Sequence, residues 1–150
     1  MFDRVVVSLD GSDTAERALP AATDLSRRLG VPLHLLRVAD LAWLSLGANE
    51  AALQYASLGD TVSDEEQASR DYLTALQQRL ATDGLTVTTE VRTGLAAREI
   101  IAAGQPGDLL VMASHGRGGP ARWLLGSVAE DVARRAASPV LLIRADQAAQ

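Results

Sequence analysis

The chain contains neither cysteine nor lysine, and these two absences narrow the chemistry that it can perform. Without cysteine there can be no disulfides and no thiolate metal sites. Without lysine, a Walker-type phosphate-binding lysine, a Schiff-base lysine and a lysine general base are all excluded. An anion bound by this protein must therefore be neutralised without any ammonium side chain.

Segments that would place the chain in a membrane or on nucleic acid are also missing. No apolar run approaches the roughly 20 residues needed to cross a bilayer. The start, Met1-Phe2-Asp3-Arg4, lacks the pattern of a signal peptide. A formal net charge of −5 argues against a nucleic-acid-binding surface. These features predict a cytoplasmic protein without membrane or nucleic-acid partners.

The residues that are present suffice for one hydrophobic core. The chain has 150 residues, 47% of them hydrophobic, which predicts a single domain over residues 1–150. Short apolar runs of strand type alternate with amphipathic segments of helix type. The expected strands are residues 5–9, 32–38, 85–92, 108–113 and 139–144, the third alternating as at a sheet edge. Such alternation gives a parallel sheet with helices on both faces.

Cap residues and apolar spacing mark the helices between these strands. The first helix is expected to be capped by Asp13 in a capping box with Glu16, or else by Ser12, and to kink or lose one backbone hydrogen bond at Pro20. The second is expected to begin at Ser63 in a capping box, which makes acidic residues 64–66 a solvated helix start rather than a metal site. The preceding segment, 39–62, is interpreted as a lid, a short extra helix or a mobile loop.

A glycine-rich loop over residues 114–119 is the most informative stretch of the chain. It follows the strand at 108–113 and precedes a helix expected near Gly126. A strand, a glycine loop and a helix start together present free backbone N–H groups to an anion. Ligands of such sheets bind beyond the carboxyl ends of strands, where strand order reverses, so Asp10 would face the same crevice. We therefore predict that the loop holds the phosphates of a nucleotide.

Several of these residues also admit a structural interpretation. A glycine loop can simply form a turn, Ser127 can be a helix cap, and Asp10 can be a capping carboxylate. His115 has no evident acidic partner, so it is interpreted as a loop-shaping or phosphate-side donor and no catalytic residue is assigned. His34, within a strand, is assigned to packing.

Five segments in combination resemble the universal stress protein family over nearly the whole chain. They are Val7-Ser8-Leu9-Asp10-Gly11-Ser12, Gly94-Leu95-Ala96, Met112-Ala113-Ser114-His115-Gly116-Arg117-Gly118-Gly119, Leu124-Leu125-Gly126-Ser127-Val128-Ala129-Glu130 and Ser138-Pro139-Val140-Leu141-Leu142. The family's nucleotide-binding branch is marked by Gly-x-x-Gly, nine residues, then Gly followed by Ser or Thr. Here Gly116, nine residues and Gly126-Ser127 match, with Ala113 in place of the leading glycine.

This resemblance implies a fold, a ligand and a set of contacts. The fold is a three-layer α/β sandwich whose five-stranded parallel, Rossmann-like sheet has the order 3-2-1-4-5 and helices on both faces. The ligand is ATP, with Mg²⁺ or Mn²⁺ accompanying the phosphates; no metal-ligating residue is assigned. The implied binding residues are Ser8, Leu9, Asp10, Val38, Met112 and Ala113 around the adenosine, and His115, Gly116, Arg117, Gly118, Gly119, Gly126, Ser127 and Val128 around the phosphates.

We therefore expect an ATP-binding stress sensor or regulator with at most slow ATP hydrolysis, because no base for the attacking water is evident. Two alternatives stay open. One is a dimeric protein that binds no nucleotide and acts through protein partners, which the departures at Ala113 and Ser8 favour. The other is a binder of AMP or a cyclic nucleotide. The apolar run Val140–Ile143 would be a pairing hazard at an exposed edge, and related proteins pair it with a second copy, so a homodimer is predicted.

Overall fold

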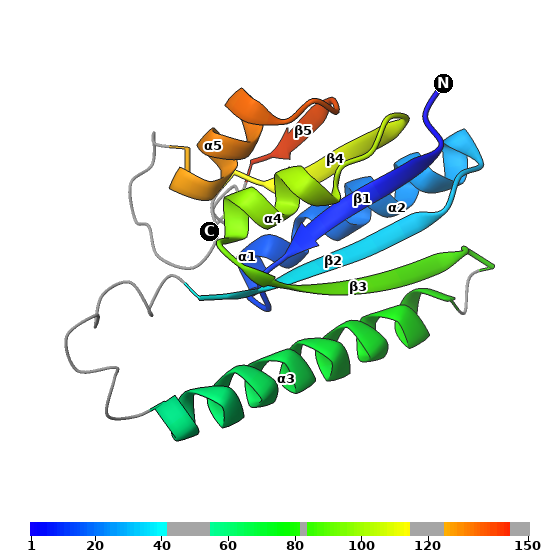
Figure 1. Cartoon of the computed structure of the whole chain (residues 1–150). Helices are drawn as coiled ribbons and strands as arrows, with labels where there is room; N and C mark the ends of the chain where they lie inside the picture. The colour runs from blue at the N-terminus through cyan, green and yellow to red at the C-terminus, as the bar shows by residue number, and fades with distance from the viewer. Residues whose placement is uncertain (42–54, 82–83, 115–124, 145–150) are drawn as a thin grey trace, which may run out of the picture.

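The computed structural model describes residues 1–41, 55–81, 84–114 and 125–144 (Figure 1). Its strands are β1 (Arg4–Leu9), β2 (Leu33–Asp40), β3 (Val87–Gly94), β4 (Asp108–Ala113) and β5 (Val140–Ile143). Its helices are α1 (Asp13–Glu16), α2 (Ala18–Leu29), α3 (Tyr55–Ala81), α4 (Ala96–Ala103) and α5 (Ser127–Arg135).

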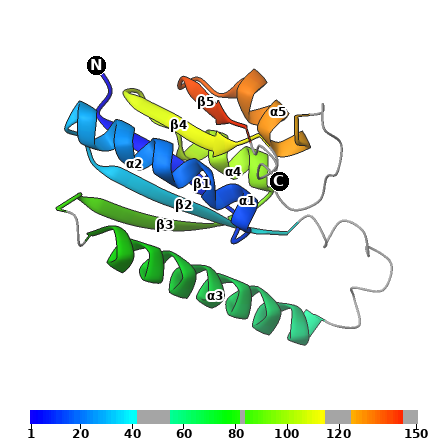
Figure 2. The same ribbon diagram turned by 180° about the vertical axis from the view of Figure 1, so that it is seen from behind.

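The sheet has the order β3-β2-β1-β4-β5, and every pair of neighbours is parallel. Helices α1, α2 and α3 lie on one face, and α4 and α5 on the other (Figures 1 and 2). The predicted fold class and strand order are confirmed. The order reverses between β1 and β4, so the carboxyl ends of these two strands flank the point where ligands of such sheets bind.

Strand β1 is the centre of the packing because it is buried on both faces. Val5, Val7 and Leu9 face α2 and α3, and Val6 faces α4 and α5. A β-branched run without alternating polarity is the pattern expected of a strand covered on both sides. Full burial of each such side chain contributes about 1.5–3 kcal/mol, so this strand fixes where the flanking loops begin.

The first predicted helix is interrupted, and the interruption has a local cause. α1 ends at Glu16 and α2 begins at Ala18, with Arg17 as the junction. Pro20 has no N–H to donate to the carbonyl of Glu16, four residues earlier, so the hydrogen-bond ladder breaks there. The expected kink is confirmed. Ser12, rather than Asp13, is the N-cap, and its Oγ accepts from the amide of Ala15 at 3.1 Å.

The start expected for the second long helix at Ser63 is wrong. α3 begins at Tyr55 and runs through Ser63 without interruption. A Ser-x-x-Glu spacing also occurs inside helices, and the Glu66 side chain accepts from the Thr93 hydroxyl at 2.5 Å instead of capping a helix. The helix packs on the sheet through Leu73 and Leu76, which are buried in the core.

The acidic residues 64–66 therefore lie within a helix and not at its start. Among the described residues, no cluster of three or more His, Cys, Asp or Glu side chains is arranged to hold a metal ion. Of the segment 39–62, residues 39–40 belong to β2 and 55–62 to α3, while 42–54 lie outside the described residues. No helix in the described part of the chain is both long and apolar enough to span a membrane.

Candidate functional site

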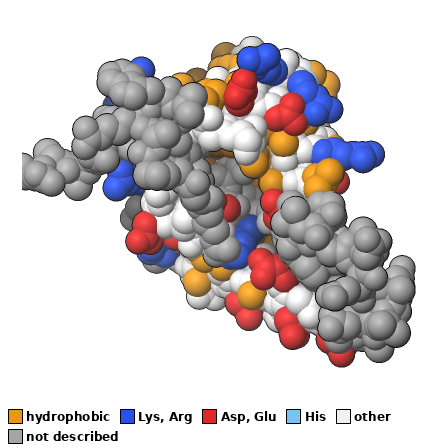
Figure 3. Space-filling view, turned by 90° about the vertical axis from the view of Figure 1, so that its left-hand side faces the viewer, with side chains coloured by type: hydrophobic (Ala, Val, Ile, Leu, Met, Phe, Trp, Pro, Cys, Tyr) orange, Lys and Arg blue, Asp and Glu red, His pale blue; other side chains and the backbone are white. Residues whose placement is uncertain are grey.

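The sheet brings together most of the predicted site residues that the structure describes. Ser8, Leu9 and Asp10 lie at the end of β1, Val38 lies near the end of β2, Met112 and Ala113 end β4, and Gly126, Ser127 and Val128 begin α5. The remaining predicted residues, His115, Gly116, Arg117, Gly118 and Gly119, lie outside the described residues. Figure 3 faces this end of the molecule, and acidic and basic side chains both appear between the atoms drawn in grey.

These residues differ in the face of the sheet toward which they point. Val38 and Met112 pack with the cluster under α4 and α5. Leu9 is 2% exposed and belongs to the opposite cluster under α2 and α3. Its side chain is therefore a core element, and only its backbone is placed to contribute to a site at the strand ends.

Asp10 builds the turn that follows β1. Its Oδ1 accepts from the backbone amide of Ser12 at 2.9 Å and from the Ser12 hydroxyl at 2.5 Å. Between them, Gly11 has φ +84°, a left-handed conformation that glycine adopts without strain. Asp10 thus orients the residue that caps α1 and does not cap the helix itself. One carboxylate oxygen already has two donors, which fixes the side chain at the mouth of the strand ends.

Arg37 supports this turn from beneath, and the sequence analysis did not identify it. The residue is 8% exposed, and its Nη1 lies 3.0 Å from the position that a Cβ on Gly11 would occupy. The guanidinium lies over the Tyr72 ring, 4.8 Å from its centre, and 3.6 Å from the Glu65 carboxylate. An arginine between the apolar residues Leu36 and Val38 of β2 was the available signal. The Arg37 side chain, which belongs to β2, thus contacts both the β1–α1 turn and α3.

Tyr72 extends the same contacts to α1. Its hydroxyl donates to Glu16 Oε1 at 2.9 Å. Burial raises the pKa of Tyr72 above its ordinary value, and the hydrogen bond to the Glu16 carboxylate raises the pKa further. The phenol is therefore a fixed donor at neutral pH. Arg79 of α3 lies 3.5 Å from the other Glu16 oxygen, so α3 contacts this carboxylate through two side chains.

The beginning of α5 is attached to the ends of two strands. The Gly126 amide donates to the Ser114 carbonyl at 2.8 Å, and the Ser114 amide donates to the Ile143 carbonyl at 2.8 Å. Gly126 is the N-cap of α5, so Ser127 is the first helical residue and the cap interpretation of Ser127 is wrong. The Gly126 amide is occupied by the protein's own carbonyl. The amides of Ser127 and Val128 follow it in the first turn, whose N–H groups have no intrahelical acceptor.

Chemically, this end of the sheet combines a carboxylate with a positive helix end. The Asp10 carboxylate is a suitable acceptor for sugar hydroxyls. The start of α5 carries the positive end of a nine-residue helix dipole and favours a negative group. His34 is not at this end, because it pairs in register with Val6 in the middle of β1. Among the described residues, the site therefore offers binding groups and no histidine base.

Comparison with known proteins identifies the family. Residues 1–144 match the model of the Universal stress protein family, and the chain belongs to that family. It is 28% identical over 147 residues to a universal stress protein of Methanocaldococcus jannaschii, covering 96% of this chain and 83% of that protein.

Other relatives differ in length. The chain is 33% identical over 141 residues to a universal stress protein of Mycobacterium tuberculosis; the match covers 93% of this chain and 44% of that longer protein. The fold is similar to that of a universal stress protein of Lactobacillus plantarum, with a TM-score of 0.81 and 25% identity, covering 95% and 98% of the two chains.

Proposed function

We propose that this universal stress protein binds an adenine nucleotide, ATP with Mg²⁺ or Mn²⁺ in the first place, at the carboxyl end of its sheet. The protein would act in the cytoplasm as a stress sensor or regulator whose shape or partner choice follows nucleotide occupancy. Hydrolysis would be slow, because the described site contains no positioned base.

The observation that carries the proposal is the attachment of α5 to the strand ends. The 2.8 Å bond between the Gly126 amide and the Ser114 carbonyl places the positive end of α5 beside the end of β4. β4 neighbours β1, at whose end the Asp10 carboxylate is held. An acceptor for a ribose and a donor end for phosphates thus lie on either side of the point where strand order reverses.

A second candidate ligand is a nucleotide with a single phosphate. A solved universal stress protein with TM-score 0.64 and 22% identity to this chain was crystallised in complex with cAMP. At that identity the similarity concerns the fold alone. In this chain, the occupied Gly126 amide leaves one donor fewer at the start of α5 than the sequence motif suggests. A smaller anion would need fewer donors.

Isothermal titration calorimetry with ATP, AMP and cAMP, each with and without Mg²⁺, tests the proposal. We expect ATP to bind most tightly and Mg²⁺ to strengthen binding. Tighter binding of AMP or cAMP would support the second candidate instead. Failure of all three to bind would refute nucleotide binding and favour a protein that acts only through protein partners.

A pair of variants locates the site. Gly126→Leu should abolish ATP binding, because the added side chain stands at the start of α5. Ala102→Leu adds a comparable side chain at an exposed position of α4 and should leave binding unchanged. Circular dichroism of both variants establishes that they are folded. Equal affinity of Gly126→Leu and the parent protein would refute the placement of the phosphates.

We also propose a homodimer formed through β5. This strand lies at one edge of the sheet, and its residues Val140–Ile143 are only partly buried. An apolar edge of this kind is stabilised by pairing with a second copy. Size-exclusion chromatography with light scattering should show a dimer at micromolar concentration, and a monomer alone would contradict the proposal.

A further inference from the structure

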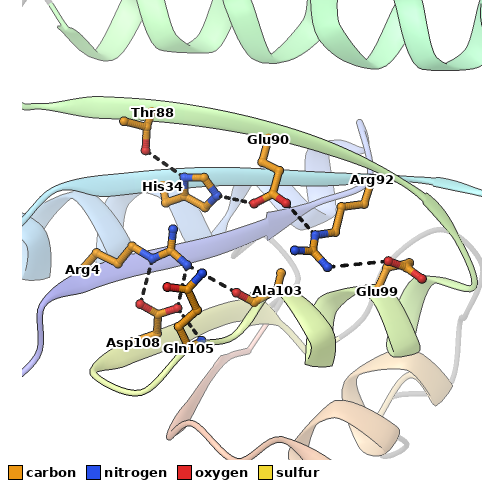
Figure 4. A network of polar contacts seen from close by, with 9 residues as sticks. All are labelled: Arg4, His34, Thr88, Glu90, Arg92, Glu99, Ala103, Gln105 and Asp108. Carbon is orange, nitrogen blue, oxygen red and sulfur yellow. Dashed lines mark hydrogen bonds and ion pairs between the residues drawn. The ribbon is translucent and has the colours of Figure 1, made fainter.

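A linear arrangement of hydroxyl, imidazole and carboxylate lies on the α4 side of the sheet, on strands β2 and β3 (Figure 4). Thr88 and His34 are direct register partners of the two strands. The Thr88 Oγ1 lies 2.8 Å from the His34 Nδ1, and the His34 Nε2 lies 3.0 Å from Oε2 of Glu90. These three residues are called the Thr88 relay below.

The partners of His34 determine which ring nitrogen carries the proton. Burial opposes ionisation of Glu90, but hydrogen bonds from Arg92 and His34 outweigh it and hold the pKa of the carboxyl below its ordinary value. Arg92 Nε lies 2.6 Å from Glu90 Oε1, and the Nη1 of the same side chain lies 3.7 Å from Glu99. An ionised carboxylate only accepts, so the Nε2 of His34 must donate. In the neutral ring, Nδ1 is then the acceptor, and the Thr88 hydroxyl donates to it.

Exposure divides the relay into a shielded base and an open hydroxyl. The His34 side chain is 8% exposed, whereas Thr88 is an exposed residue of the edge strand. A hydroxyl hydrogen-bonded to a base that a third group orients is the arrangement of an activated nucleophile. It is also the order of groups that performs acyl transfer in unrelated folds.

We propose that Thr88 is a nucleophilic hydroxyl that accepts acyl groups from activated esters, with His34 as its general base and Glu90 as the residue that orients His34. This site is distinct from the proposed nucleotide site and does not depend on it. The surrounding charges favour an acyl rather than a phosphoryl donor. Three carboxylates, Glu90, Glu99 and Asp108, accompany two guanidiniums, Arg4 and Arg92, each of which is already paired.

The step conserves atoms and charge. The Thr88 Oγ bonds to the carbonyl carbon of the ester while its proton passes to the Nδ1 of His34. The bond from the carbonyl carbon to the leaving oxygen breaks, and that oxygen departs with the electron pair of the bond as an alkoxide or phenolate. The imidazolium that forms is paired with the Glu90 carboxylate, and it then releases its proton to the leaving group or to water. The product is an ester on Thr88.

The composition of the chain makes this reaction simple to measure. With no lysine and no cysteine, two of the usual competitors for acylating reagents are absent from the sequence, and peptide mass spectrometry distinguishes Thr88 from the Met1 amine and the two tyrosines that remain. We expect p-nitrophenyl acetate to acetylate the intact protein and peptide mass spectrometry to place the acetyl group on Thr88. The rate should depend on His34, which is the general base of this step. The charged groups facing that base are Arg4 of β1, Glu90 and Arg92 of β3, Asp108 of β4 and Glu99 of α4.

Variants separate the relay from ordinary surface reactivity. Thr88→Ala should remove the adduct, and Thr88→Ser should retain it. His34→Gln keeps a hydrogen-bonding group but loses the base, and should slow acetylation by about 100-fold. Thr89→Ala is the matched control, because Thr89 is equally an exposed threonine of β3 but points to the opposite face. Acetylation of Thr88 should be unchanged in that variant.

Three results would each overturn the proposal. These are the absence of a Thr88 adduct in the parent protein, equal acetylation of Thr88 and Thr89, and an unchanged rate in His34→Gln. Circular dichroism and thermal unfolding monitor the fold of each variant. Should His34→Gln fail to fold, the parent protein still decides, because a Thr88 hydroxyl without a general base would be acetylated no faster than the equally exposed Thr89.

Discussion

Arg4 and Arg37 lie at opposite ends of the sheet, and the two ends are held by different forces. Arg4 makes two parallel hydrogen bonds of 2.8 Å to Asp108, whose side chain is 3% exposed. Arg37 lies 3.6 Å from the carboxylate of the half-exposed Glu65 and packs on Gly11 and the Tyr72 ring. The amino end is thus fixed by matched charges, and the carboxyl end by packing around a turn.

This contrast indicates which end is able to adjust. A bidentate arginine–carboxylate pair has one favourable geometry, and moving one partner away leaves the buried charge of the other without compensation. A guanidinium held against a glycine and an aromatic ring can shift with the turn that it supports. The end at which we propose ligand binding is therefore the end with the less rigid cation.

The largest loss of stability is expected when the Arg4–Asp108 ion pair at the amino end of the sheet is removed. Asp108→Ala leaves Arg4 without its carboxylate, and should lower the free energy of unfolding by about 3–5 kcal/mol. Urea denaturation measures the change. Asp131→Ala, which removes an exposed partner 3.0 Å from Arg135, is the control and should cost less than about 1 kcal/mol. Comparable losses for the two variants would remove the distinction between the ends.

Two glycines with positive φ angles, Gly11 and Gly30, test whether Arg37 restrains the turn at the carboxyl end of the sheet. Gly11 has φ +84° and Gly30 has φ +67°, but only at Gly11 would a Cβ meet the Arg37 guanidinium. Gly30→Ala should therefore cost only the backbone term of about 1–2 kcal/mol. Gly11→Ala should cost slightly more in urea denaturation, because the Arg37 guanidinium must also move aside, and it should weaken ATP binding in calorimetry. Equal losses at both positions would show that Arg37 does not restrain the turn.

Lowering the pH should remove the stability that the Arg4–Asp108 pair contributes at the amino end of the sheet. Burial opposes ionisation of Asp108, but hydrogen bonds from Arg4 and the Gln105 amide outweigh it and keep the pKa of this carboxyl below its ordinary value of 3.8. A depressed folded-state pKa gives stability that is present above the unfolded-state value and lost as pH falls through the folded-state value. The parent protein should therefore lose more stability than Asp108→Asn between neutral pH and pH 3. Parallel curves from thermal unfolding would contradict this.

The smallest effect on stability is expected from Arg37→Met, which keeps the apolar stem of the side chain and removes the guanidinium. We expect a loss of about 1 kcal/mol in the free energy of unfolding, since packing is largely preserved. Under the proposed function, ATP affinity should fall because the Asp10–Ser12 turn loses its support. Arg28→Met, at an exposed pair with Asp24, is the control and should change neither quantity. Unchanged ATP affinity in Arg37→Met would confine this arginine to a structural role.

The sequence predicted those parts of the fold that depend on local pattern. Strand β4 was predicted with the bounds Asp108–Ala113 that the structure has, because a short buried run between turn residues has few alternatives. The start of α3 was misplaced at Ser63, because the local capping signal carries no information about the Thr93 hydroxyl that engages Glu66.

The site was predictable only in its outline. Asp10 was named from its place at a strand end, and Gly126 from the order of strand, glycine loop and helix start and from the family motif; their role in binding stays a prediction. The contact between Arg37 and Gly11 joins two strands, and no periodicity within either strand reports it. His34 was assigned to packing, and it is indeed buried, but both ring nitrogens have partners on β3 that only the β2–β3 register reveals.

The bond between the Ser114 carbonyl and the Gly126 amide has an evolutionary consequence. It fastens the two ends of the intervening segment to each other at 2.8 Å, independently of how many residues lie between them. Closing a longer loop costs little, about 0.6 kcal/mol for each doubling of its length. A change of length between these two anchors would therefore leave β4 and α5 in place, so that selection for the proposed nucleotide, and not for the scaffold, would keep the nine-residue spacing between Gly116 and Gly126.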